Sequence, residues 1–373
     1  MLTRADFLIR DDIVFLNHGS FGACPRPVFE RYQAWQLELE RQPIEFLLRN
    51  RAALMAEARS RIAEYFNVSC EDIVFVTNAT AGLNIALRSL RLQPGDEILT
   101  SSHEYGAVYR LLEFVAAKTG ARIIPHQVHL PYETDAAFLD AFFADASART
   151  KAIVISHITS PSSLIFPVEL ICRRAREQGI LTIIDGAHAP GQLPLDLTTI
   201  GADIYSGNFH KWMCAPKGSG FLHVRPEHQA MIDPLVISHG WREGSGFVER
   251  NEWGGTRDIA PFLTVPAAID FLREHDWDKV RARCHKLAAR AQAEICARYG
   301  LRPLSRNQFA QMVTIPLPEC KAAAVKEQLY DTYGIEVPIG RYFDRCGVRV
   351  SVQAYNRADD IAQLVAALEA LID

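Results

Sequence analysis

Residues 151–188, KAIVISHITSPSSLIFPVELICRRAREQGILTIIDGAH, contain two apolar runs on either side of a helical pattern. The runs KAIVISHI (151–158) and ILTIIDGAH (180–188) are short and rich in branched side chains, as buried strands are. The segment PVELICRRAREQG (167–179) between them ends in a glycine, a residue that commonly closes a helix. This order of strand, helix and strand predicts two parallel strands joined by a crossover helix.

The same alternation continues toward the N-terminus of this segment. It predicts an α/β fold with a mostly parallel sheet that helices cover on both faces. Ligands of such sheets bind beyond the carboxyl ends of the strands. The expected strands are 72–78, 96–102 and 121–128, and the expected helices are 79–90, 109–120 and 134–146.

The pattern changes at residue 260, where two longer helices are expected over 260–275 and 276–300. A second α/β pattern follows, with strands at 311–318 and 347–355 and helices at 320–334 and 358–373. We therefore expect a large domain over 51–260 and a smaller C-terminal α/β domain over 261–373. The first 50 residues are expected to link to the small domain.

Composition limits the possible functions. A net charge of −4 argues against nucleic-acid binding, and the apolar runs are too short to cross a bilayer. Asp11 and Asp12 interrupt the region where a signal peptide would need an apolar core. The eight cysteines form no CxxC pair and no cluster with zinc-like spacing, so no metal site is expected. We expect a cytoplasmic protein with neither nucleic-acid nor membrane partners.

Two candidate binding groups follow expected strands. NATAG (78–82) stands where a strand gives way to a helix, so backbone N–H groups and the Thr80 hydroxyl could hold an anion there. The alternative is an ordinary N-cap. Asp185 follows the strand at 180–184 and could either pair with a buried cation or cap the next helix.

Two candidate cationic groups complete the set. Lys211 lies in YSGNFHKWMCAPKGSGFL (205–222), among apolar residues and glycines. A lysine whose pKa is lowered by burial can form a Schiff base, whereas the alternative is a solvated loop lysine. Arg349 lies on an apolar strand, GVRVSVQ, where its guanidinium could bind a carboxylate with two hydrogen bonds.

Together these four groups match the needs of one cofactor, pyridoxal 5′-phosphate (PLP). PLP needs a held phosphate, an acid beside its ring nitrogen and a lysine for its aldehyde. NATAG, Asp185 and Lys211 would supply these three. Arg349 would then bind the carboxylate of an amino-acid substrate.

Seven motifs in this order resemble the class V branch of fold-type-I PLP enzymes, and the resemblance covers nearly the whole chain. Within that branch the sequence is most similar to isopenicillin N epimerase-like proteins. The motifs are FLNHGSFGACP (15–25), NATAGLN (78–84), SHEYGAV (102–108), SHITSPSSLIFPV (156–168), DGAHAPG (185–191), FHKWMCAPKGSGFL (209–222) and EWGGTRD (252–258).

The resemblance implies a large PLP-binding domain, a homodimer with a shared active site, and roles for individual residues. Lys211 would carry the cofactor, Asp185 would pair with its ring nitrogen, and His188 would reach the side of the ring hydroxyl. Tyr105 would stack on the ring, with His103 as the alternative. The phosphate would be held by Ala79, Thr80, Ala81, His210 and either Asn208 or Ser206, and by Thr256 across the dimer interface. Arg349 and Asn17 would bind the substrate.

One departure narrows the reaction. Sulfur-carrying desulfurases of this class have a nucleophilic cysteine in a loop before the arginine, but EVPIGRYFD (336–344) has none. Cys346 is expected to pack on its strand instead. The remaining reactions are epimerisation at the α-carbon, β-elimination by a C–S lyase, and transamination. Two readings from other classes are a non-catalytic sensor and a nicotinamide dehydrogenase, and the second lacks a GxGxxG motif.

Overall fold

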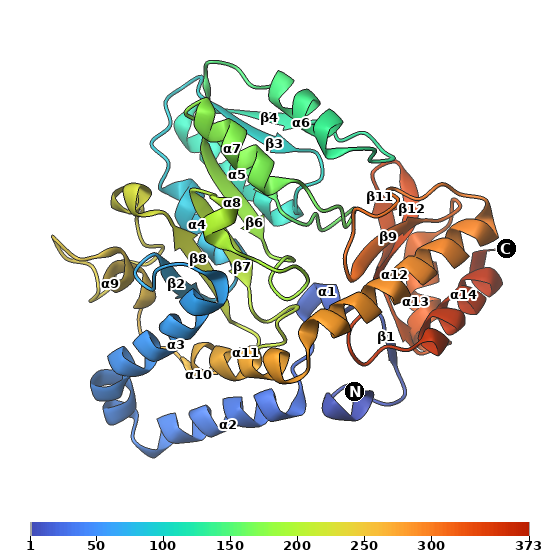
Figure 1. Cartoon of the computed structure of the whole chain (residues 1–373), viewed down its shortest axis with the longest axis horizontal. Coiled ribbons are helices and arrows are strands. Elements are labelled where there is room, and N and C mark those ends of the chain that lie inside the picture. Colours follow the sequence, from blue (N-terminus) through green and yellow to red (C-terminus); the bar gives the residue numbers. More distant parts are fainter. Residues whose placement is uncertain (1, 373) are drawn as a thin grey trace.

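A seven-stranded sheet forms the centre of the larger part of the molecule, in a computed structural model that describes residues 2–372 (Figure 1). Its strand order is β2-β8-β7-β6-β5-β3-β4. Only β8 is antiparallel to its neighbours, so the expected mostly parallel sheet is confirmed. The strands are β2 Ile73–Val76, β3 Glu97–Ser101, β4 Arg122–His126, β5 Thr150–Ser156, β6 Leu181–Gly186, β7 Ile204–Asn208 and β8 Gly220–Val224.

Helices cover both faces of this sheet because alternate residues of the buried strands point to opposite sides. On β2, Val74 and Val76 pack with α4 and α5, whereas Ile73 and Phe75 belong to the core on the other face. That second core also contains residues of α3, α6 and α7. The helices and short turns of this part are α3 Arg51–Phe66, α4 Ala79–Arg88, α5 Gly106–Thr119, α6 Asp135–Ala144, α7 Val168–Glu177, α8 Leu197–Ile200, η3 Pro226–Met231 and α9 Phe247–Glu252.

A second, antiparallel sheet has the order β11-β12-β9 and lies beside the C-terminal helices. Its strands are β9 Met312–Pro316, β11 Ile339–Tyr342 and β12 Arg345–Ser351, and its helices are α12 Trp277–Tyr299, α13 Ala322–Asp331 and α14 Ala358–Ile372. The interpretation of residues 336–344 as a loop was wrong, because β11 forms a hairpin with β12. The helix expected over 260–275 is two helices, α10 Ala260–Leu263 and α11 Val265–Glu274, and Pro266 lies in the first turn of the second.

The N-terminal residues contact both parts of the molecule. They form η1 Arg4–Asp6, β1 Val14–Phe15, α1 His18–Phe21, α2 Arg26–Arg41 and η2 Glu45–Asn50. β1 pairs with β10 Ile335–Glu336, and α2 packs against α10 and α11. The domain limits expected from the sequence remain a prediction. Between residues 2 and 372, no helix has the length and apolar character needed to cross a membrane.

The turn after α1 packs directly on the backbone that carries Lys211. His18 Nε2 lies 2.9 Å from the Lys211 carbonyl oxygen, and His18 Nδ1 lies 3.0 Å from the Tyr355 hydroxyl. Gly22 has φ +72°, and a Cβ atom there would lie 2.0 Å from the His210 carbonyl oxygen. A side chain at Gly22 would therefore push the N-terminal segment away from Lys211.

Replacing Gly22 with alanine should lower the free energy of unfolding by about 3 kcal/mol or more, because it combines backbone strain with a clash against backbone. Gly95→Ala is the matched control, since Gly95 has φ +88° and nothing lies within 4 Å of its Cβ position. The control should lose only about 1–2 kcal/mol. Urea unfolding of both variants measures the difference, and equal losses would contradict the close packing of this turn.

Candidate active site

One cavity of about 330 Å³ lies at the carboxyl ends of β5, β6 and β7. Parallel strands deliver their last residues to the same edge of a sheet, and the N-termini of the following helices lie beside them. The cavity collects eight of the residues chosen from the sequence: Ala79, Thr80, Tyr105, Asp185, His188, Asn208, His210 and Lys211.

A hydrogen-bond chain fixes the state of the Lys211 amine. The Trp212 indole can only donate, and its Nε1–H donates to His188 Nδ1 at 3.2 Å. The neutral His188 ring therefore carries its proton on Nε2, which lies 3.1 Å from Lys211 Nζ. A donor at Nε2 needs a lone pair on Nζ. This arrangement thus favours the neutral form of the Lys211 amine.

The net effect of burial and of the charges around Lys211 is to lower its pKa. Burial lowers the pKa of Lys211 to about 8, with Asp185 raising it and Arg349 lowering it further. Burial also lowers the pKa of His188 well below its ordinary value, and the Lys211 charge adds to that shift. A substantial fraction of the amine is therefore unprotonated near neutral pH, as a nucleophile or base requires.

Asp185 is a buried acid placed to meet a cation. It follows the apolar run of β6, and 4% of its surface is exposed. Its Oδ1 accepts the Ala187 N–H at 2.9 Å, and no group within residues 2–372 hydrogen-bonds to its second oxygen. Burial raises the pKa of Asp185, while the Ala187 N–H and the Lys211 charge lower it. A protonated ring nitrogen would satisfy the second oxygen.

The N-terminus of α4 has fewer free donors than the sequence suggests. The Ala79 N–H donates to Asn208 Oδ1 at 2.8 Å, and the Ala81 N–H donates to Asn78 Oδ1 at 2.9 Å. The N–H and hydroxyl of Thr80 have no partner among the described residues. Thr80 is therefore the group best placed to bind a phosphate at this helix end.

Two further candidates for the phosphate site are now distinguished. Asn208 lines the cavity, whereas the Ser206 hydroxyl is buried and donates to the Phe221 carbonyl at 2.9 Å. His210 also lines the cavity, and its Nδ1 lies 2.9 Å from the Ser219 carbonyl oxygen. His210 Nδ1–H therefore donates to the backbone, which fixes the orientation of the ring.

Arg349 lies next to the cavity, behind two serines that line it. Its NH1 donates to the carbonyl and the hydroxyl of Ser160 at 2.9 Å each, and its NH2 donates to Ser20 Oγ at 3.1 Å. Its Nε is buried and has no partner within the described chain. Asn17 is one residue further away and accepts the Ser20 hydroxyl at 2.6 Å.

Three candidates are separated by the fold. Tyr105 lines the Lys211 cavity. His103 instead lies 2.8 Å from the Ser162 hydroxyl and stacks on Phe343 with ring centroids 3.9 Å apart. The stacking of Tyr105 on the cofactor ring remains a prediction. Thr256 lines a different hollow of the same chain, so its contact with the phosphate across a dimer interface remains a prediction.

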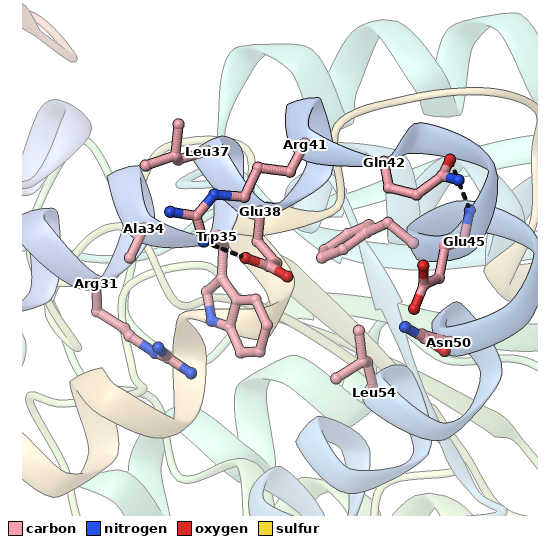
Figure 2. Close-up of a pocket in the computed structure, with 11 residues that line it drawn as sticks. Arg31, Ala34, Trp35, Leu37, Glu38, Arg41, Gln42, Glu45, Asn50 and Leu54 are labelled. Atoms are coloured by element: carbon pink, nitrogen blue, oxygen red, sulfur yellow. Dashed lines mark hydrogen bonds and ion pairs between the residues drawn. The ribbon is translucent and has the colours of Figure 1, made fainter.

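Sequence reasoning missed several polar residues of this site. Ser156 and Ser160 line the cavity, as does Lys217. Ser156 is the polar last residue of a largely apolar strand and Ser160 stands in a loop, so neither belongs to a periodic pattern. Lys217 stands in a turn-rich stretch that is typical of exposed loops. A separate hollow of about 510 Å³ lies along α2 and η2, where Arg31 covers the Trp35 ring and Glu38 pairs with Arg41 (Figure 2). It shares no lining residue with the Lys211 cavity.

Comparisons with known proteins agree with this geometry. The family model for aminotransferase class-V matches residues 25–364. Isopenicillin N epimerase of Streptomyces clavuligerus is 35% identical over 99% of this chain and 97% of its own. A probable chloroplastic L-cysteine desulfhydrase of Arabidopsis thaliana is 27% identical over 97% of this chain and 83% of its own.

A solved structure shares the fold. A mutant of C-DES with glycine covalently linked to its PLP cofactor superposes with a TM-score of 0.84 and 20% identity, covering 99% of each chain. The unpartnered groups of Thr80 and Asp185, with the neutral amine of Lys211, suit the phosphate, ring nitrogen and aldehyde of this cofactor. The chain belongs to the class-V aminotransferase family, and PLP is its cofactor.

Proposed function

We propose that this protein is an isopenicillin N epimerase-like enzyme that acts at the α-carbon of an amino-acid-like substrate. The observation that carries the proposal is the placement of a neutral Lys211 amine in one cavity with Asp185, while Arg349 lies behind the serines of its wall. The full-length similarity to isopenicillin N epimerase at 35% identity supports the choice of reaction.

Each residue has a defined task in this proposal. Bound PLP supplies an electron sink that acidifies the α-proton of an attached amino acid. Asp185 holds a proton at the ring nitrogen, which maintains that sink. The neutral amine of Lys211 accepts the α-proton with its single lone pair, which it must first release from His188 Nε2–H. His188 thus positions the amine before the transfer, which needs the base within reach of the proton.

Arg349 orients the substrate through its carboxylate. The two terminal nitrogens of the guanidinium already donate to Ser160 and Ser20, so these hydrogen bonds fix its orientation. A carboxylate bound to this guanidinium would be fixed relative to Lys211, and the buried Nε has no partner within the described chain. Asn17 supports this end by holding the Ser20 hydroxyl.

Epimerisation also needs a proton donor on the face of the substrate opposite Lys211. We assign this role to Tyr105, whose hydroxyl-bearing ring lines the cavity. Tyr105 is 49% exposed, and apolar residues in the segment before Thr256, including Val236, Ile237 and Trp241, are also exposed. A cytoplasmic homodimer that covers these groups and brings in Thr256 of a second copy forms part of the proposal. The unpaired state of all eight cysteines supports a reducing compartment.

A β-eliminating C–S lyase is the second candidate. Its support is the similarity to the Arabidopsis protein named as a probable L-cysteine desulfhydrase. Desulfurase chemistry has weaker support because the tip of the β11–β12 hairpin carries Phe343 and Asp344 rather than a cysteine. Cys346 is fully buried, as expected, and its thiol contacts the Cys320 carbonyl. Transamination would use the same first proton transfer to Lys211.

Lys211→Ala should abolish the visible absorption band of lysine-bound PLP and the covalent label left by borohydride reduction. Lys217→Ala is the matched control, because Lys217 lines the same cavity yet has no contact with His188. The control should keep both signals. Peptide mapping that places the pyridoxyl label on Lys217 would contradict the assignment.

Arg349→Lys should raise KM by about 10- to 100-fold, the equivalent of one charge-assisted hydrogen bond or more. The absorption of bound PLP should change little, because lysine keeps the positive charge and loses only the planar pair of donors that binds a carboxylate. Steady-state kinetics with the best substrate of an amino-acid panel measure the effect. An unchanged KM would show that another group binds the carboxylate.

In deuterated water the wild-type protein should exchange the α-proton of its substrate. An epimerase should also scramble the α-configuration without forming a keto acid, whereas a C–S lyase should release pyruvate and sulfide from cysteine. NMR of the amino acid and a pyruvate assay distinguish the two. If PLP-loaded protein shows neither exchange nor product across the amino-acid panel, the proposed chemistry at the α-carbon is wrong.

A further inference from the structure

A second acid, Glu104, is buried beside the Lys211 cavity. It lies between the end of β3 and Tyr105, and 5% of its surface is exposed. Within residues 2–372 no cation lies within ion-pair distance of its carboxylate. Its partners are two hydroxyls, Ser101 Oγ at 2.5 Å and Ser156 Oγ at 2.6 Å. Burying a carboxylate without a cation costs free energy of folding, which suggests that Glu104 has a function at this position.

Ser156 connects Glu104 to the cofactor site. It is the last residue of β5 and pairs in register with Asp185 on β6. Both Ser156 and Asp185 line the cavity, whereas Glu104 does not. The Ser156 side chain therefore separates Glu104 from the part of the cavity where Asp185 would meet the ring nitrogen.

The direction of the hydrogen bonds determines what this wall offers. An ionised carboxylate only accepts, so the Ser156 hydroxyl proton is directed toward Glu104 and away from the cavity. Ser156 then presents only lone pairs to the cavity, and so does ionised Asp185. Hydrogen-bond acceptors on this side of the cavity stabilise the protonated form of the ring nitrogen relative to the unprotonated form.

We propose that Glu104 is a positioning residue that keeps the cofactor's ring nitrogen protonated, by directing the Ser156 proton away from the cavity and placing negative charge behind Asp185. The inference rests on the proposed role of Asp185 but does not depend on which reaction follows. Burial raises the pKa of Glu104 to about 7; the two serine hydroxyls lower it, and Asp185 raises it. The carboxylate is therefore largely ionised at pH 8, where the role is best tested.

The test uses holoenzyme loaded with PLP labelled with ¹⁵N in the ring, observed by NMR at pH 8 and above. Wild type should give the resonance of a protonated nitrogen. Glu104→Gln should lower the nitrogen's pKa by about one unit or more, because an amide has no charge and its NH₂ donates. Glu104→Asp, which keeps the charge, should recover part of the loss.

Two serine variants separate this role from a structural one. Ser156→Ala removes the link to the cavity and should shift the nitrogen in the same direction as Glu104→Gln. Ser101→Ala removes the other hydroxyl, which does not line the cavity. Because that hydroxyl lowers the pKa of Glu104, this control is read at the highest pH of the series, where Glu104 stays ionised, and there it should leave the resonance unchanged. An unchanged resonance in folded Glu104→Gln overturns the proposal, and Ser156→Ala decides in the same way if the glutamine variant does not fold. No substrate is involved, so the result is separate from the α-proton exchange.

Discussion

The burial of Lys211 beside His188 is the constraint on which the rest of the site depends. Removing an amine from water favours its neutral form, and the indole of Trp212 fixes the imidazole tautomer that donates to it. A neutral amine can attack an aldehyde and later accept a proton. Asp185, which is also buried, raises the pKa of Lys211 against the effect of burial, and it would favour a proton on the ring nitrogen of bound PLP.

Holding this amine requires parts of the chain that are far apart in the sequence. The large sheet supplies Asp185 and Asn208 from strand ends, while His18 and the tight turn at Gly22 pack on the Lys211 backbone. The small sheet supplies Arg349, which crosses to Ser160 and Ser20. In the proposed function, the substrate carboxylate is bound from one part of the molecule and the cofactor from the other. A change in their relative position would alter substrate binding before it altered the cofactor.

The sequence predicted what local patterns determine. Alternating apolar runs and glycine-closed helices predicted the parallel sheet, and the motifs placed Asp185 and Lys211 at its edge. Short β11 was missed because its stability comes from pairing with β12, a contact that residues 339–342 do not reveal by themselves. Glu104 and Ser160 were missed for a similar reason: their roles depend on partners 52 and 189 residues away in the chain.

The titration of Lys211 is the most direct test of whether burial favours its neutral amine. Competitive acetylation of the cofactor-free protein across a range of pH, followed by peptide mass spectrometry, gives the pKa of each reactive lysine. Exposed Lys326 provides an internal reference within the same sample. Burial of the amine predicts that Lys211 titrates with a pKa of about 8, below that of the reference lysine. A Lys211 midpoint equal to that of Lys326 would show that the amine is not held neutral, and the proposed basis of the site would fail.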